Sequence, residues 1–125
     1  MTSKYKYYKY WIPAILYMAL LFYLSSRPAP AELDLIPVIA KLKLVHIIEY
    51  GILYFLLWYA ITKTTAYSKI EVFILALFAT ILYGLTDEFH QIFVAGRSAK
   101  LIDIVANGVG GVLAGLGIKL RNQSN

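Results

Sequence analysis

The sequence predicts an all-α membrane protein whose four transmembrane helices form an up-down bundle. Of its 125 residues, 60% are hydrophobic and only 15% are charged. The apolar residues form four long stretches, and a helix needs about 20 such residues to cross the ~30 Å hydrocarbon core of a bilayer. Basic and aromatic residues gather at the ends of these stretches, as is typical of membrane interfaces. We therefore expect residues 1–125 to form one membrane domain.

The first span is expected at about residues 10–24, which is short for a full crossing. Residues 4–11 combine lysines with tyrosines and a tryptophan, and this pattern is typical of an interfacial anchor. Pro13 is placed in the first turn of the span, where its missing N–H is tolerated. The alternative is a cleaved signal peptide, with residues 29–31 as a cleavage site. The aromatic flank favours a retained helix.

The other three spans are expected at about residues 44–62, 72–93 and 101–120. Between the first and second spans, residues 25–42 form the only sizeable loop. It contains Pro28, Pro30 and Pro37, so it is expected to begin extended.

The distribution of basic residues predicts the orientation. Of the 12 Lys and Arg residues, seven lie on the side of the two termini and five on the other side. This excess favours cytoplasmic termini in a multi-pass protein of the cytoplasmic membrane. It also explains the net charge of +5 without a nucleic-acid partner. The bilayer is the expected partner, and the oligomeric state does not follow from the sequence.

Polar residues occur where two apolar stretches begin and a third ends. Ionisable side chains inside a membrane are costly, and they usually mark a functional site. In an up-down bundle these three segment ends lie on one side, here the extracytoplasmic one. The second span begins with His46 and Glu49, the third ends with Asp87, Glu88, His90 and Gln91, and the fourth begins with Asp103 and Asn107.

Helical spacing assigns these residues to faces. His46 and Glu49 are neighbours at i and i+3, with Tyr50 beside them. In the third span Asp87, His90 and Gln91 share a face, and Glu88 lies beside it. In the fourth span Asp103 and Asn107 are followed on the same face by Gly111 and Gly115, a row of small residues that would let another helix come close.

Two roles are expected for the polar residues. General acid or base chemistry is assigned to His46, Glu49, Asp87, Glu88 and His90. Substrate binding is assigned to Lys43, Tyr50, Gln91, Arg97, Asp103 and Asn107. The guanidinium of Arg97, in the loop above the cluster, could clamp a phosphate or a carboxylate.

Three motifs resemble those of the VanZ-like family, and they follow one another in that family's order and spacing. They are residues 43–50 around His46, residues 87–98 from Asp87 to Ser98, and residues 103–111 from Asp103 to Gly111; residues 25–28 are similar to the family's serine-proline signature. Leu42 and Ala95 depart from the family pattern, which often has an acidic residue and a proline there. The resemblance implies a small polytopic membrane protein and a link to resistance against teicoplanin-type glycopeptides.

Several readings of the polar residues remain open. They could bind or process a lipid-linked envelope intermediate or a lipophilic glycopeptide, or they could only lock the helices together. A metal set of His46, Glu49, Asp87 and His90 matches no established zinc spacing, so no metal and no cofactor are assigned. Ion conduction would need an oligomer. The chain has no cysteine, which excludes thiolate chemistry, and whether it is an enzyme is left undecided.

Overall fold

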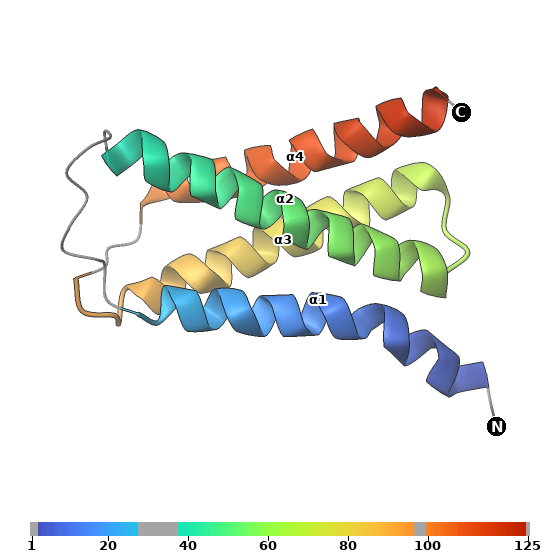
Figure 1. The fold of residues 1–125 in the computed structure, drawn as a ribbon, viewed down its shortest axis with the longest axis horizontal. Helices are drawn as coiled ribbons and strands as arrows, with labels where there is room; N and C mark the ends of the chain where they lie inside the picture. Colours follow the sequence, from blue (N-terminus) through green and yellow to red (C-terminus); the bar gives the residue numbers. More distant parts are fainter. Residues whose placement is uncertain (1–2, 28–37, 97–99, 125) are drawn as a thin grey trace.

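The computed structural model describes residues 3–27, 38–96 and 100–124, and these residues form four helices and no strand. The helices are α1 (Ser3–Ser25), α2 (Val38–Thr64), α3 (Lys69–Gln91) and α4 (Leu101–Gln123). They run alternately up and down, so both ends of the chain lie at the same end of the bundle (Figure 1). The expectation of an all-α polytopic membrane protein is confirmed.

Among the described residues, three helical segments are long and apolar enough to cross a membrane: Lys43–Thr64, Lys69–Gln91 and Leu101–Gln123. The helix α1, which contains the first expected span, is not one of them. Large apolar side chains are exposed along all four helices, including Ile15, Phe78 and Leu113. Water would penalise such a surface, whereas lipid tails match it. The fold is that of a membrane protein whose apolar side chains face lipid.

The helices extend beyond most of the expected spans, and three of the differences at helix ends matter here. First, α1 begins at Ser3, so Pro13 lies inside the helix and not in its first turn. Its ring removes one hydrogen bond of the helix, and the N-terminal part of α1 turns away from the bundle (Figure 1). Second, α2 begins at Val38, so residues 38–42 are helical and do not belong to the expected loop. Third, α3 ends at Gln91, two residues before the expected end of the third span.

The centre of the bundle is α2, which packs against each of the other three helices. Its buried residues recur at helical spacing along one face: Tyr50, Leu53, Tyr54, Leu57 and Ile61. Within the described residues, α1 packs on α2 and α3 and makes no contact with α4. Two tyrosine hydroxyls join α1 to these helices. Tyr17 of α1 donates to the backbone carbonyl of Glu49 in α2 (2.9 Å), and Tyr83 of α3 donates to the backbone carbonyl of Met18 in α1 (2.5 Å).

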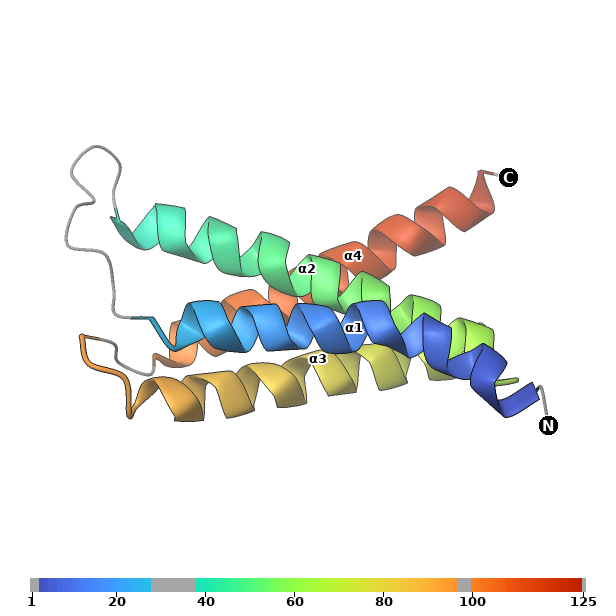
Figure 2. The ribbon, with the colours of Figure 1, turned by 60° about the horizontal axis from the view of Figure 1, so that its bottom comes forward.

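Glycines allow α2 and α4 to cross closely, as Figure 2 shows. A Cβ atom on Gly51 would lie 3.3 Å from the carbonyl oxygen of Gly110, and a Cβ on Gly110 would clash with the carbonyl oxygen of Ile47. The expectation that Gly111 and Gly115 let another helix come close is partly corrected here. Gly111 and Gly115 are buried, but they make room for side chains of α2 and α3, while the closest backbone approach is at Gly110.

Candidate functional site

The expected site residues that the structure describes lie toward the end of the bundle away from the two termini, as helix parity predicts (Figure 1). They come from the first half of α2, the last two turns of α3 and the first two turns of α4. Six of these residues, which we call the polar cluster, lie between α2, α3 and α4. They are His46, Tyr50, Asp87, Glu88, Asp103 and Asn107.

The centre of the polar cluster is a hydrogen bond between α2 and α3. The hydroxyl of Tyr50 donates to Oδ2 of Asp87 over 3.0 Å, and both side chains are buried. Asn107 of α4 lies beside this pair, because a Cβ on Gly84 would be 3.0 Å from its amide nitrogen and 3.2 Å from the ring of Tyr50. Gly84 thus leaves the space that lets α4 reach the pair.

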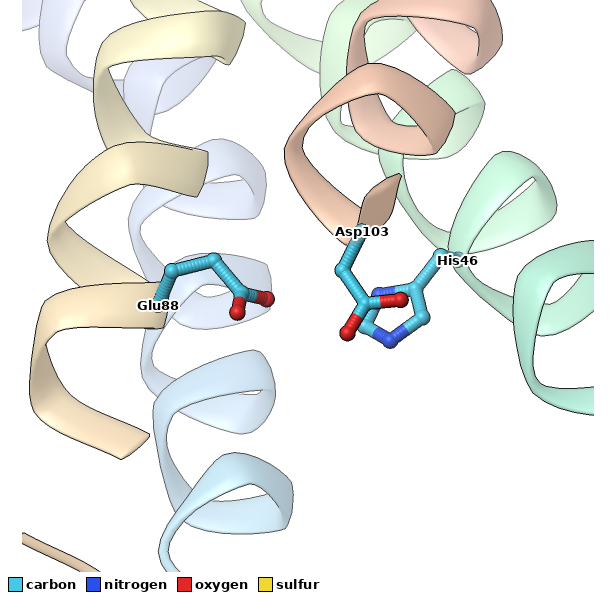
Figure 3. Close-up of side chains that lie close together, drawn as sticks. All are labelled: His46, Glu88 and Asp103. Carbon is cyan, nitrogen blue, oxygen red and sulfur yellow. The ribbon is translucent and has the colours of Figure 1, made fainter. Parts of the chain in front are cut away.

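Near the end of the bundle, three ionisable residues approach one another from three helices. These are His46 of α2, Glu88 of α3 and Asp103 of α4, which we call the carboxylate–histidine triad (Figure 3). One ligand atom from each lies within 4.8 Å of the other two. Glu88 is only 2% exposed, whereas His46 and Asp103 are half-buried. The triad therefore extends from the interior of the bundle toward its surface.

The carboxylate of Glu88 has a defined position. Its Oε2 accepts a hydrogen bond of 3.3 Å from the backbone N–H of Lys100, the residue that precedes α4. A negative charge at a helix N-terminus is favoured by the helix dipole, and Asp103 lies in the first turn of the same helix. The N–H of Lys100 thus satisfies one carboxylate oxygen of Glu88. The other oxygen, Oε1, accepts no hydrogen bond from the described residues.

Several polar atoms of the cluster are buried without a hydrogen-bond partner among the described residues. They are Nδ1 of His46, Oδ1 of Asp87, Oε1 of Glu88 and both side-chain polar atoms of Asn107. Most buried polar groups in proteins are hydrogen-bonded, and each orphaned group costs about 1–3 kcal/mol. Five such atoms therefore lie close together with unused hydrogen-bonding capacity.

Two expected site residues, His90 and Glu49, are in contact with the α1 side of the bundle through a side chain and a backbone carbonyl, respectively. Nε2 of His90 lies 2.9 Å from the hydroxyl of Ser26, and its ring stacks on Phe22 at 4.4 Å between centroids, so His90 faces α1. Glu49 is half-buried, and its backbone carbonyl oxygen accepts a hydrogen bond from Tyr17 of α1. The ligand atoms that converge in the described part of the chain are those of His46, Glu88 and Asp103, so the alternative metal set that included Glu49 and His90 is not assembled there.

The remaining expected residues lie at the edge of the cluster or beyond what the structure describes. Gln91 is buried and Lys43 is half-buried. Arg97 lies outside the described residues. Sequence reasoning gave no role to Ser26 and Phe22 as the partners of His90, although parity places the end of the first span at the same end of the bundle.

Comparison with known proteins gives one match. A family model described as VanZ/LLP1 matches residues 10–122, which include the whole polar cluster. No curated protein and no solved structure matches the chain.

Proposed function

The chain belongs to the VanZ/LLP1 family, as its three motifs indicated, and from this premise we propose that its polar cluster binds the polar part of a lipid-linked or lipophilic molecule of the cell envelope. The group of buried polar atoms without partners carries this proposal. A bound polar group would supply the missing hydrogen bonds and remove their cost.

The surroundings of the cluster favour a ligand with an apolar part. At the same end of the bundle, large apolar side chains are exposed on α3, on α4 and in the turn after α3, among them Phe89, Phe93 and Leu101. A molecule whose tail lies along this surface could place its head at the half-buried His46 and Asp103. Polar and apolar recognition at one place is what an amphiphile requires.

The proposal includes an orientation. With both termini in the cytoplasm, the polar cluster lies at the outer leaflet of the cytoplasmic membrane, where envelope precursors and lipophilic glycopeptides are present. The excess of basic residues on the side of the termini supports this arrangement. Tolerance of teicoplanin-type glycopeptides would follow if the protein bound either the drug or the precursor that the drug recognises.

The competing function is a purely structural cluster. The bond from Tyr50 to Asp87 and the bond from Lys100 to Glu88 both join different segments of the bundle, as a helix lock would. A lock, however, needs no additional partner, whereas five buried polar atoms here have no hydrogen-bond partner among the described residues. This contrast favours a binding site.

Growth of a glycopeptide-sensitive Gram-positive host in teicoplanin tests the proposal. Wild-type protein is expected to raise the tolerated concentration, and Glu88→Gln is expected to remove most of that gain at equal membrane abundance. Loss of a hydrogen bond to a charged group weakens binding by about tenfold or more. Glu71→Gln is the matched control, because glutamine preserves the capping box with Ser68 at the opposite end of α3. Full tolerance in Glu88→Gln, or poor membrane levels of that variant alone, would favour the structural lock.

A further inference from the structure

We propose that the carboxylate–histidine triad of His46, Glu88 and Asp103 binds a divalent transition-metal ion, with Zn²⁺ the preferred one. The three residues come from three different helices, and one nitrogen and two carboxylate oxygens converge between them (Figure 3). This proposal deepens the proposed function, and it rests on that function only for the identity of the envelope molecule that would bind to the metal. Metal binding itself can occur whatever the ligand is.

The buried, unpartnered oxygen of Glu88 is an independent reason to expect an ion. Glu88 is 2% exposed, its Oε1 has no hydrogen-bond partner in the described part of the chain, and its carboxylate points toward Asp103 and His46. Nδ1 of His46 is also buried without a partner. A water molecule could satisfy one of these atoms, but an ion satisfies the imidazole nitrogen and both carboxylates together.

Charge balance points to a dication. Two ionised carboxylates and a neutral imidazole carry two negative charges, and a divalent ion brings the sum to zero. An uncompensated charge among apolar helices is costly, and a neutral complex lowers that cost. The N-terminus of α4 supplies only a partial positive charge.

The types of ligand select among the metals. Ca²⁺ and Mg²⁺ prefer sites made of oxygen alone, while imidazole nitrogen favours transition metals. The chain has no cysteine, so ions that need thiolate are excluded. Zn²⁺ sites with three protein ligands and an open fourth position are common in proteins that act on a bound molecule.

The geometry is compatible with such a site. Ligand atoms in a tetrahedral zinc site lie about 3.4 Å apart, given metal–ligand distances of about 2.0–2.2 Å. The triad atoms are already within 4.8 Å of one another, so small rotations of half-buried side chains close the site. The N–H of Lys100 on Oε2 of Glu88 acts as the outer hydrogen bond that orients a ligating carboxylate.

An open metal position would explain how the cluster recognises its ligand. A metal ion attracts and polarises a phosphate or carboxylate oxygen. The ligand class is therefore an anionic amphiphile, whose oxygen binds the metal while its tail remains in the lipid.

The test uses the purified full-length protein in detergent, prepared with an affinity tag free of histidine and treated with a chelator. Titration with Zn²⁺ is expected to show one tight equivalent per chain, and millimolar Mg²⁺ is not expected to displace it. His46→Gln and Asp103→Asn should each weaken binding at least about tenfold. His90→Gln and Glu71→Gln are the matched controls and should bind like wild type, because the first faces α1 and the second lies at the other end of α3.

The outcomes separate this proposal from the proposed function. Less than one equivalent of Zn²⁺ in folded wild type, or equal binding after His46→Gln, would overturn the metal site. Preference for Mg²⁺ over Zn²⁺ would overturn the assigned class of metal. Since these readouts need no phenotype, the metal site can fail while teicoplanin tolerance still depends on Glu88. The reverse result is tight Zn²⁺ binding by a wild-type protein that does not raise teicoplanin tolerance in the host. It would support the metal site and refute the proposed function.

Discussion

The hydroxyl of Tyr50 is the only donor in the described residues that reaches the carboxylate of Asp87. The tyrosine is 1% exposed and lies between α2 and α3, so no water can replace the hydroxyl without a rearrangement. Because Oδ1 of Asp87 already has no partner, loss of the bond to Oδ2 would leave both oxygens unpaired.

We therefore expect Tyr50→Phe to lower the free energy of unfolding by about 1–3 kcal/mol, the cost of a stranded buried polar group. Thermal unfolding in detergent, followed by circular dichroism, measures the effect. Tyr67→Phe is the matched control, because Tyr67 is exposed in the turn before α3. Equal stability of the two variants would show that the bond to Asp87 contributes nothing to the fold.

At this scale the sequence predicted which residues are polar and at which end of the bundle they lie, but not all of their directions. Successive residues of a helix are rotated by about 100°, so His90 lies about 60° to one side of Asp87 and Glu88 lies about 100° to the other. Spacing gives these angles but does not say which helix occupies each side. In the structure α1 is on the side of His90 and α4 is on the side of Glu88.

Among the helices, the close approach of α2 and α4 depends on Gly110. A Cβ there would clash with the carbonyl oxygen of Ile47, and backbone cannot move aside as a flexible side chain can. Gly117 lies further along α4 and differs in this respect, because a Cβ on it would meet no neighbouring heavy atom within 4 Å.

Gly110→Ala is therefore expected to destabilise the bundle by about 1–3 kcal/mol, the usual cost of overpacking, and to disturb the polar cluster next to the crossing. Gly117→Ala should leave stability unchanged or slightly raised, since alanine is the better helix former. Thermal melts of the two variants, measured side by side, give the comparison. A Gly110→Ala protein as stable as Gly117→Ala would contradict the tight crossing.

The helices themselves were largely predictable, because long apolar stretches separated by polar segments define spans by length alone. Their ends were less so. The expected interfacial anchor at residues 4–11 is rich in lysine and tyrosine, and its residues 4–9, which precede the expected span, belong to α1. The lysines near the start of α2 likewise lower the hydropathy there, so the expected second span begins later than the helix does. A charged residue can extend a helix beyond the hydrocarbon, so hydropathy marks the membrane boundary and not the helix end.

For the molecule as a whole, the alternating directions of the helices follow from the parity of the spans, but the side of the membrane does not. The excess of basic residues on the side of the termini favours cytoplasmic termini, and labelling of single cysteines tests this orientation.

Because the chain has no cysteine, single cysteines give an unambiguous measurement. Ala95→Cys is exposed at the end of the bundle with the polar cluster, and Ser124→Cys is at the opposite end. An impermeant thiol reagent on intact cells should label Ala95→Cys, and it should label Ser124→Cys only after the membrane is permeabilised. The opposite pattern would place the polar cluster on the cytoplasmic side.

The crossing of α2 and α4 has a mechanical consequence. Gly51 lies at the midpoint of α2, and Gly110 lies close to the midpoint of α4. The two helices therefore cross and touch about halfway along their lengths. A change in the angle between them that draws their ends together on one side of the membrane also draws their ends together on the other side. Contraction around an ion at His46 and Asp103 would thus be transmitted, through two rigid rods, to the opposite face of the bilayer.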